Sequence, residues 1–84
     1  SFLGHYYLGR VYLAAQDFPR AEQAFNDALR LNPTAEPVLV DLAVLHEAAG
    51  RPDQAIAIYE QVLRTNPGRD QIRRRLGALY ARQR

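Results

Sequence analysis

Two segments of the chain, AEQAFNDALRLNP at residues 21–33 and AIAIYEQVLRTNP at residues 55–67, are versions of one pattern. Both begin with alanine, place an aromatic residue four positions later and end in Asn-Pro. Pro33 and Pro67 therefore lie 34 residues apart, and Phe25 and Tyr59 keep the same offset. A fixed period of this length is typical of helical repeat arrays, so this repeat decides the fold.

The same period extends outward to the rest of the chain. Leu8-Gly9-x-x-Tyr12 is followed 34 residues later by Leu42-Ala43 and again, after a second period, by Leu76-Gly77-x-x-Tyr80. We therefore expect a single domain over residues 1–84, with one unit at 2–35, a second at 36–69 and a C-terminal half unit or capping helix at 70–84. The chain does not begin with Met, and we expect it to be an excised fragment or a processed product.

Apolar residues recur at helical spacing within each unit. The spacing predicts five helices, roughly Phe2–Ala15, Pro19–Leu31, Glu36–Ala49, Asp53–Thr65 and Asp70–Arg82. Proline is favoured in the first turn of a helix, and the residue before a proline avoids the helical region, so Pro19 starts a helix and each Asn-Pro ends one. Turns of only a few residues make successive helices antiparallel.

The apolar stripes also predict the core. Small residues would let the helices approach closely, and large ones would fill the remaining space. We expect the following to face inward: Leu8, Val11, Tyr12 and Ala15 in the first helix, Ala21, Ala24, Phe25, Ala28 and Leu29 in the second, Tyr59 in the fourth, and Ile72, Leu76, Leu79 and Tyr80 in the last.

With this period, the anchor residues resemble the tetratricopeptide repeat (TPR) family; they are Leu8, Gly9, Tyr12, Ala21, Phe25, Ala28 and Pro33 in the first unit and Leu42, Ala43, Ala55, Tyr59 and Pro67 in the second. The resemblance covers nearly the whole chain. It implies an all-α fold, a right-handed α-solenoid of antiparallel helix-turn-helix repeats with about 2.5 units and five helices. His5, His46 and Arg73 depart from the family pattern. Arg73 replaces an apolar residue, which indicates that the last helix is a solvated cap or that the chain was cut there.

The resemblance also implies a function, namely binding a protein partner along the concave face formed by the first helix of each unit. The matching positions are Leu3, Tyr6, Tyr7, Arg10, Pro37, Val40, Asp41, Val44, Glu47, Gln71, Arg74, Arg75 and Ala78. Aromatic residues and Arg are the types enriched in interface hot spots. We interpret the face as a groove for a peptide or helix of a partner. The alternative is that these side chains pack against repeats absent from this chain.

Some family members clamp the C-terminal carboxylate of a chaperone peptide with Lys and Asn side chains. The matching positions here are Tyr6, Arg10, Asp41, Gln71 and Arg75. Only Arg75 keeps a matching charge, and Asp41 would repel the carboxylate. We therefore do not expect chaperone-tail binding.

The basic residues are all Arg, and six of the 11 lie in residues 69–84 beside a single acid, Asp70. Arg suits carboxylate and phosphate pairing better than Lys does. Binding of nucleic acid or of an acidic partner through Arg73, Arg74 and Arg75 is thus an alternative function, although no base-reading module accompanies the run and we do not favour nucleic acid. A further alternative function is self-association through Phe2 and Leu3 or through the last helix. Exclusive use of Arg indicates a GC-rich, bacterial source.

Catalytic and metal chemistry is not expected from this composition. The chain has no Cys, and its one Ser is the first residue, so no nucleophile has a base beside it. His5 and His46 are far apart and are interpreted as packing residues, so we expect no metal, no cofactor and no enzymatic activity. No apolar run is long enough for a membrane span, and a soluble protein of the cytoplasm or the periplasm is expected.

Overall fold

The computed structural model describes residues 1–83, and five α-helices follow one another along them. They are α1 (Phe2–Ala14), α2 (Phe18–Leu31), α3 (Glu36–Ala48), α4 (Pro52–Thr65) and α5 (Asp70–Arg82). The predicted all-α repeat stack is confirmed, and every helix boundary lies within one residue of the sequence-based expectation. The period fixed these boundaries because its Pro and Asn-Pro positions are the points where a helix starts and stops.

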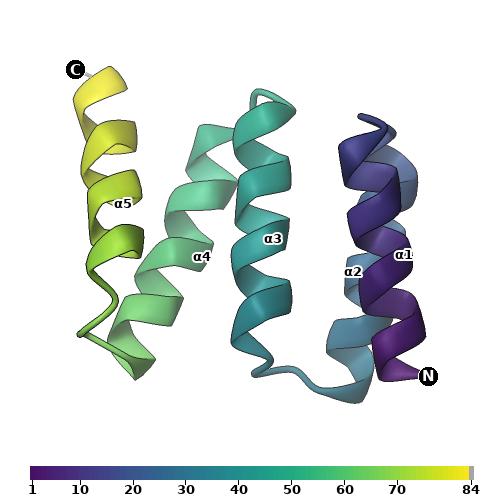
Figure 1. The fold of residues 1–84 in the computed structure, drawn as a ribbon. Coiled ribbons are helices and arrows are strands. Elements are labelled where there is room, and N and C mark those ends of the chain that lie inside the picture. Colours follow the sequence, from purple (N-terminus) through teal and green to yellow (C-terminus); the bar gives the residue numbers. More distant parts are fainter. Residues whose placement is uncertain (84) are drawn as a thin grey trace.

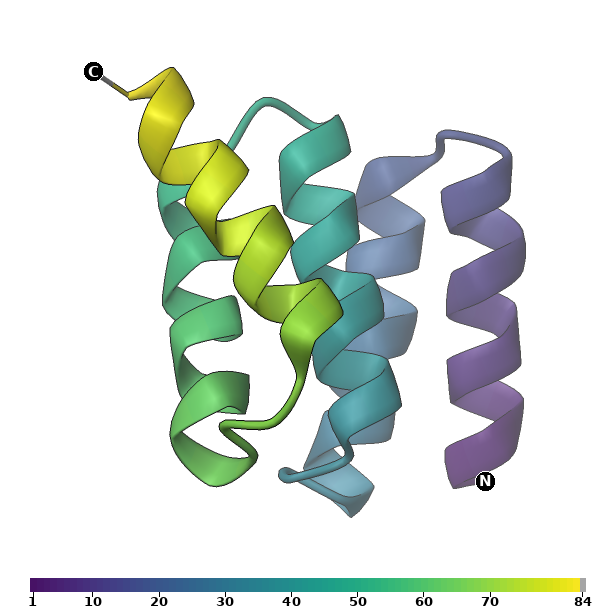
Figure 2. The same ribbon diagram turned by 60° about the vertical axis from the view of Figure 1, so that its left-hand side comes forward.

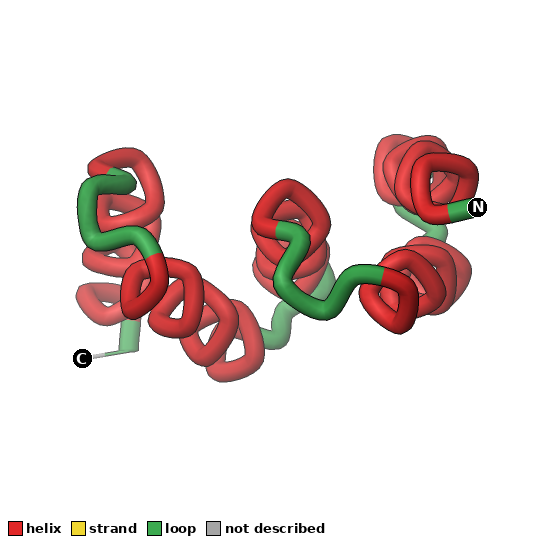
Figure 3. The backbone as a smooth tube through the Cα atoms, turned by 90° about the horizontal axis from the view of Figure 1, so that it is seen from below, coloured by secondary structure: helices red, strands yellow, loops and turns green. Residues whose placement is uncertain are grey.

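The helices form two layers. Figures 1 and 3 show α1, α3 and α5 side by side in one layer, with α2 and α4 in the layer behind them. Seen end-on in Figure 3, the stack is curved, and its inner side is formed by α1, α3 and α5. Each helix packs mainly on its neighbour in the chain, with additional contacts between α1 and α3. This order places the first helix of every unit on the concave side.

Local capping explains where the first two helices begin. The Ser1 hydroxyl accepts a hydrogen bond from the Gly4 amide at 3.0 Å, and the Asp17 carboxylate accepts one from the Arg20 amide at 3.4 Å. These side chains satisfy amides that have no partner within the helix. Proline occupies the first turn of α2, α3 and α4, where a missing N–H costs nothing.

The turn between the two helices of a unit has the same geometry in both units. Gln16 has φ +60° and Gly50, one period later, has φ +77°. The next amide in each turn, Asp17 or Arg51, donates to a carbonyl five residues back. The left-handed backbone conformation of this turn is easily adopted by Gly50, which has no Cβ. It is strained for Gln16, because the Gln16 Cβ crowds the following carbonyl oxygen.

The core consists of two clusters, one for each full unit. The first joins α1, α2 and α3 around Phe25, and the second joins α3, α4 and α5 around Tyr59; both rings are fully buried. Gly9 lets α1 approach α2 closely, since a Cβ built on it would lie 2.5 Å from the Phe25 ring. A small residue therefore packs against a large one between α1 and α2 as expected, whereas a Cβ built on Gly77, at the same repeat position in α5, has no atom within 4 Å.

Six of the residues expected to be inward are not fully buried: Tyr12 and Leu29 are half-buried, and the other four are exposed. Leu8, Val11, Ala15 and Tyr80 are all exposed. In the later units the residues equivalent to Leu8 and Val11 are covered by the preceding helix, and in the described chain no helix precedes α1. Tyr80 instead donates its hydroxyl hydrogen bond to the Glu60 carboxylate at the surface.

Candidate functional site

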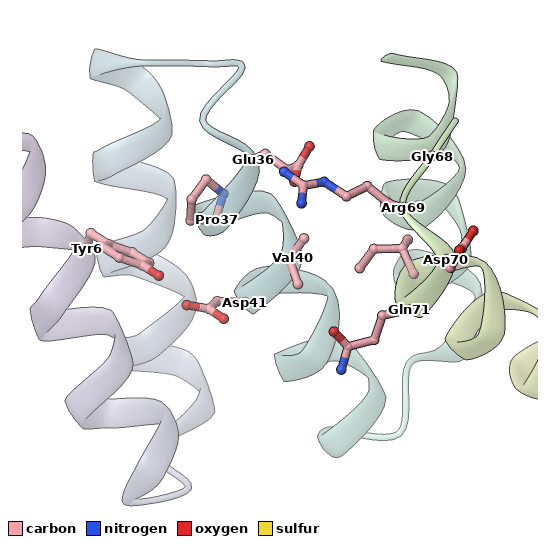
Figure 4. A pocket seen from close by; sticks show the side chains of 10 residues that line it. Tyr6, Glu36, Pro37, Val40, Asp41, Gly68, Arg69, Asp70 and Gln71 are labelled. Atoms are coloured by element: carbon pink, nitrogen blue, oxygen red, sulfur yellow. The ribbon is translucent and has the colours of Figure 1, made fainter. Parts of the chain in front are cut away.

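A hollow opens on the concave side between α1, α3 and the start of α5. Its volume is about 390 Å³. Figure 4 shows side chains from all three helices around it. Its lining residues are Tyr6, Glu36, Pro37, Val40, Asp41, Gly68, Arg69, Asp70, Gln71 and Ile72. Five of the expected groove positions, Tyr6, Pro37, Val40, Asp41 and Gln71, are thus brought together in one place.

The Tyr6 side of the hollow carries a small polar network. The Arg10 guanidinium lies over the Tyr6 ring, 5.8 Å from its centroid, and Arg10 Nε is 3.9 Å from Asp41 Oδ2. Burial, and then the nearby Asp41 carboxylate, raise the pKa of Tyr6. Asp41 Oδ2 is itself enclosed and has no hydrogen-bond donor within residues 1–83. The Arg10 guanidinium compensates the charge of this oxygen, and the rest of the Asp41 side chain, which is 27% exposed, lines the hollow.

The opposite rim of the hollow is formed by an ion pair between the start of α3 and the connection before α5. Arg69 Nη2 lies 2.7 Å from Glu36 Oε2, and Figure 4 shows the Arg69 side chain reaching across toward Glu36. Sequence analysis did not include Glu36, Gly68, Arg69, Asp70 or Ile72 in the site. The only sequence signal is their position beside the Asn-Pro connections, at which the first helix of each unit begins.

Glu47 joins three helices farther along the concave side. It accepts a hydrogen bond from the Tyr59 hydroxyl of α4, and its carboxylate lies 3.3 Å from Arg75 Nη1 and 3.7 Å from Arg82 Nη2 of α5. Burial, with Glu47 as the next cause, raises the pKa of Tyr59. Glu47 was expected as a groove residue, and the structure shows it held by α4 and α5. Its charge therefore stabilises the stack and is only partly accessible to a partner.

Several other groove candidates have accessible apolar or aromatic surface. Leu3 and Tyr7 are more than half exposed, Val44 is half-buried, and Ala78 is exposed. Tyr7 lies beside Tyr6, with the ring centroids 5.5 Å apart. Large exposed side chains gathered on one face are typical of binding surfaces.

Of the three consecutive Arg side chains in α5, Arg73 and Arg75 contact other parts of the stack and Arg74 does not. Arg73 pairs with Asp70 at 3.2 Å and also donates to the Pro67 carbonyl, so it holds the start of α5. Arg75 contacts Glu47 as described, whereas Arg74 is exposed and makes no ion pair with residues 1–83. The positive charge available to a partner is therefore smaller than the sequence indicates.

Both histidines have packing or surface roles in the structure. His46 is buried, and burial lowers its pKa, with Arg51 as the next cause. His5 Nδ1 lies 3.9 Å from Asp27 Oδ2 at the surface. Within the described residues, no three His, Asp or Glu side chains form a cluster suited to a metal ion, and no helix there has the length and apolar character to cross a membrane.

The structure consists of antiparallel helix pairs that repeat every 34 residues and form a concave face. This arrangement defines a helical-repeat protein. The sequence profile described as tetratricopeptide repeat matches residues 12–82. A TPR repeat-containing protein of Methanocaldococcus jannaschii is 34% identical over 59 residues, which is 70% of this chain and 10% of that protein. The chain belongs to the tetratricopeptide repeat family and spans about a tenth of this relative. The relative is archaeal, and a bacterial source for the present chain stays a prediction.

Proposed function

We propose that this chain binds a short segment of another protein, an extended peptide or a helix, in the concave groove between α1, α3 and α5. Tetratricopeptide repeats are generally non-catalytic modules for protein–protein interaction. The single observation that carries the proposal is the hollow of about 390 Å³ beside exposed Tyr7, half-buried Val40 and the partly exposed Asp41 side chain. Apolar contacts would supply binding energy, and the partly exposed Asp41 and Arg10 side chains would fix the partner's position.

The chemical character of the groove changes from one end to the other, which supports a partner that binds in a single orientation. Its α1 end presents Leu3 and Tyr7, its centre presents Asp41, and its α5 end presents Arg74. A partner segment with apolar side chains at one end, an N–H or cationic donor in the middle and a carboxylate at the other end would match all three. Such complementarity fixes register and suppresses wrong partners.

The test begins with a library of displayed peptides selected on the native chain. The affinity of a selected peptide is then compared between the native chain, Tyr7→Glu and the control Leu31→Glu. Leu31 is equally exposed but lies at the end of α2, in the other layer. We expect Tyr7→Glu to weaken binding at least about tenfold, as loss of an interface aromatic does, and the control to leave it unchanged. A peptide held equally by both variants would place the binding surface elsewhere.

The sequence-based alternative of an acidic partner at the Arg-rich end is tested in the same assay. Arg74→Glu should reduce the affinity of peptides whose carboxylate faces α5 and leave neutral peptides unaffected. Arg74 is chosen because its charge has no described partner, so the substitution disturbs no ion pair of the stack. Binding to nucleic acid instead would appear as a steep loss of affinity with rising salt.

A further inference from the structure

The second unit carries a polar pair of side chains where the first unit carries an apolar pair. In the first unit, Leu13 packs against the core cluster that contains Phe25. One period later these two positions hold Glu47 and Tyr59, and the Tyr59 hydroxyl donates a hydrogen bond to the Glu47 carboxylate. The fold does not require this exchange, because the apolar pair fills the same place between α1 and α2. A carboxylate that is only 18% exposed needs partners that offset its lost hydration.

Two arginines of α5 are the charged partners of this carboxylate. Arg75 and Arg82 are about two helical turns apart, so they lie on the same side of α5. Arg75 Nη1 lies 3.3 Å from Glu47 Oε2, and Arg82 Nη2 lies 3.7 Å from Glu47 Oε1. A single carboxylate therefore faces two guanidinium groups on the concave side of the stack.

Both arginines keep hydrogen-bond donors that Glu47 does not use. A guanidinium group has several N–H donors, and its best hydrogen bonds to a carboxylate are about 2.7–2.9 Å long. The contacts of Arg75 and Arg82 with Glu47 are longer than this. The Arg75 side chain is 44% exposed and the Arg82 side chain is 68% exposed, so part of each guanidinium group is open to a bound molecule.

The acids of α4 do not neutralise these two arginines. Asp53 accepts a hydrogen bond from the Gln83 amide, and Glu60 accepts one from the Tyr80 hydroxyl. At the spacing of an α-helix, Gln83 is rotated about 100° around α5 from Arg82, and Tyr80 is rotated about 140° from Arg75. The two acids therefore contact other sides of α5. On the concave side, positive charge exceeds negative charge, which favours a partner that brings a carboxylate.

A second hollow lies directly beside Arg82. Its volume is about 220 Å³, and it is lined by Glu47, Gly50, Pro52, Leu79, Arg82 and Gln83. Figures 1 and 2 show the end of α5 and the connection between α3 and α4 at the same end of the stack. This hollow shares no lining residue with the larger one at the start of α5. Pro52 and Leu79 give its wall apolar surface, so it suits an apolar side chain next to a charged one.

We propose that Arg75 and Arg82 bind the side-chain carboxylate of an Asp or Glu in the partner segment, and that a neighbouring apolar side chain of that segment enters the hollow at Pro52. This inference rests on the proposed function, because the site lies on the same concave side as the groove. Glu47 holds the two guanidinium groups together, and the partner's carboxylate accepts the N–H groups that Glu47 leaves free. The segment is therefore acidic at its α5 end, with an apolar residue beside the acid.

The test selects peptides on the native chain from a displayed library in which no peptide has a free C-terminus. A selected peptide is then synthesised with acetylated and amidated ends, once with Glu and once with Gln at its acidic position. Calorimetric titration measures the affinity of both peptides for the native chain, Arg82→Gln and the control Arg64→Gln. Arg64 is also exposed, but it lies in α4, in the other layer, and forms no ion pair within residues 1–83. Circular dichroism checks that each variant is folded.

We expect Arg82→Gln to weaken binding of the Glu peptide at least about fivefold and binding of the Gln peptide less than about twofold, because a charge pair couples only its own two partners. Arg64→Gln should leave both affinities unchanged. Selected peptides without an acid, equal losses for the two peptides, or binding that requires a free C-terminus would overturn this inference and leave peptide binding by the groove intact. Selection of no peptide at all would overturn both the inference and the proposed function.

Discussion

Gly9 and Gly77 occupy the same position of the repeat in different surroundings, which makes a matched pair of Gly→Ala substitutions informative. A Cβ at Gly9 would lie 2.5 Å from two atoms of the fully buried Phe25 ring, whereas a Cβ at Gly77 meets nothing within 4 Å. Both residues lie inside terminal helices of the stack, α1 and α5. The two substitutions therefore share their backbone effect and differ in packing.

The expected changes in the free energy of unfolding follow from these surroundings. Ala is favoured over Gly inside a helix by about 0.8–1.0 kcal/mol, so Gly77→Ala should raise the free energy of unfolding by about that amount. Gly9→Ala gains the same but overpacks the Phe25 ring, which costs about 1–3 kcal/mol. The difference between the two variants isolates this strain. For a chain of 84 residues, each kcal/mol shifts Tm by about 4–8 °C.

Thermal and urea unfolding of the two variants, followed by circular dichroism, measure this difference. We expect Gly77→Ala to melt above the native chain and Gly9→Ala to melt below Gly77→Ala by at least 4 °C or so. Adding Phe25→Leu to Gly9→Ala should remove most of the strain, because the smaller side chain leaves room for the new methyl group. Equal stabilisation by both alanines would refute the close approach of α1 to α2.

Three further predictions concern the turn, the buried histidine and the core. Gln16→Gly should raise the free energy of unfolding by about 1 kcal/mol in urea unfolding, since it relieves a side chain held at φ +60°; a loss of stability would contradict the turn geometry. Burial lowers the pKa of His46, so the unfolded chain binds more protons as pH falls through about 6.5, and stability should decrease from pH 7 toward pH 5. His46→Tyr should flatten that part of the pH profile, and an unchanged slope would show that His46 is not its source. Phe25→Ala should cost about 3–5 kcal/mol, and an unchanged Tm would show that the assigned register is wrong.

The period predicted most of the fold because the repeat carries its own start and stop signals. Pro33 and Pro67 end helices for reasons local to the backbone, so the boundaries needed no knowledge of packing. Burial of Phe25 and Tyr59 followed from the repeat as well. The exposure of Leu8 and Val11 did not follow from the repeat, because a repeat pattern indicates which face of a helix is apolar but not whether a neighbouring helix covers it.

The site was only partly predictable for a related reason. The family resemblance placed Tyr6, Val40 and Asp41 on one face, and the structure brings them around one hollow. The ion pair of Glu36 with Arg69 and the attachment of Glu47 to α4 and α5 depend on how α3, α4 and α5 are tilted against one another. These contacts between helices cannot be read from a pattern that gives only the spacing of residues along the chain.

The most direct test of the groove is site-specific photocrosslinking in cells of the source organism. A photoreactive phenylalanine analogue is placed at Tyr7, on the concave side, or at Leu31, at the end of α2; the two native side chains are 55% and 60% exposed. If the concave groove holds a partner, the Tyr7 position forms a crosslink to a defined segment of one protein, and the Val44→Glu substitution abolishes it. A crosslink from Leu31 alone, or one from Tyr7 that survives Val44→Glu, would contradict the proposed function.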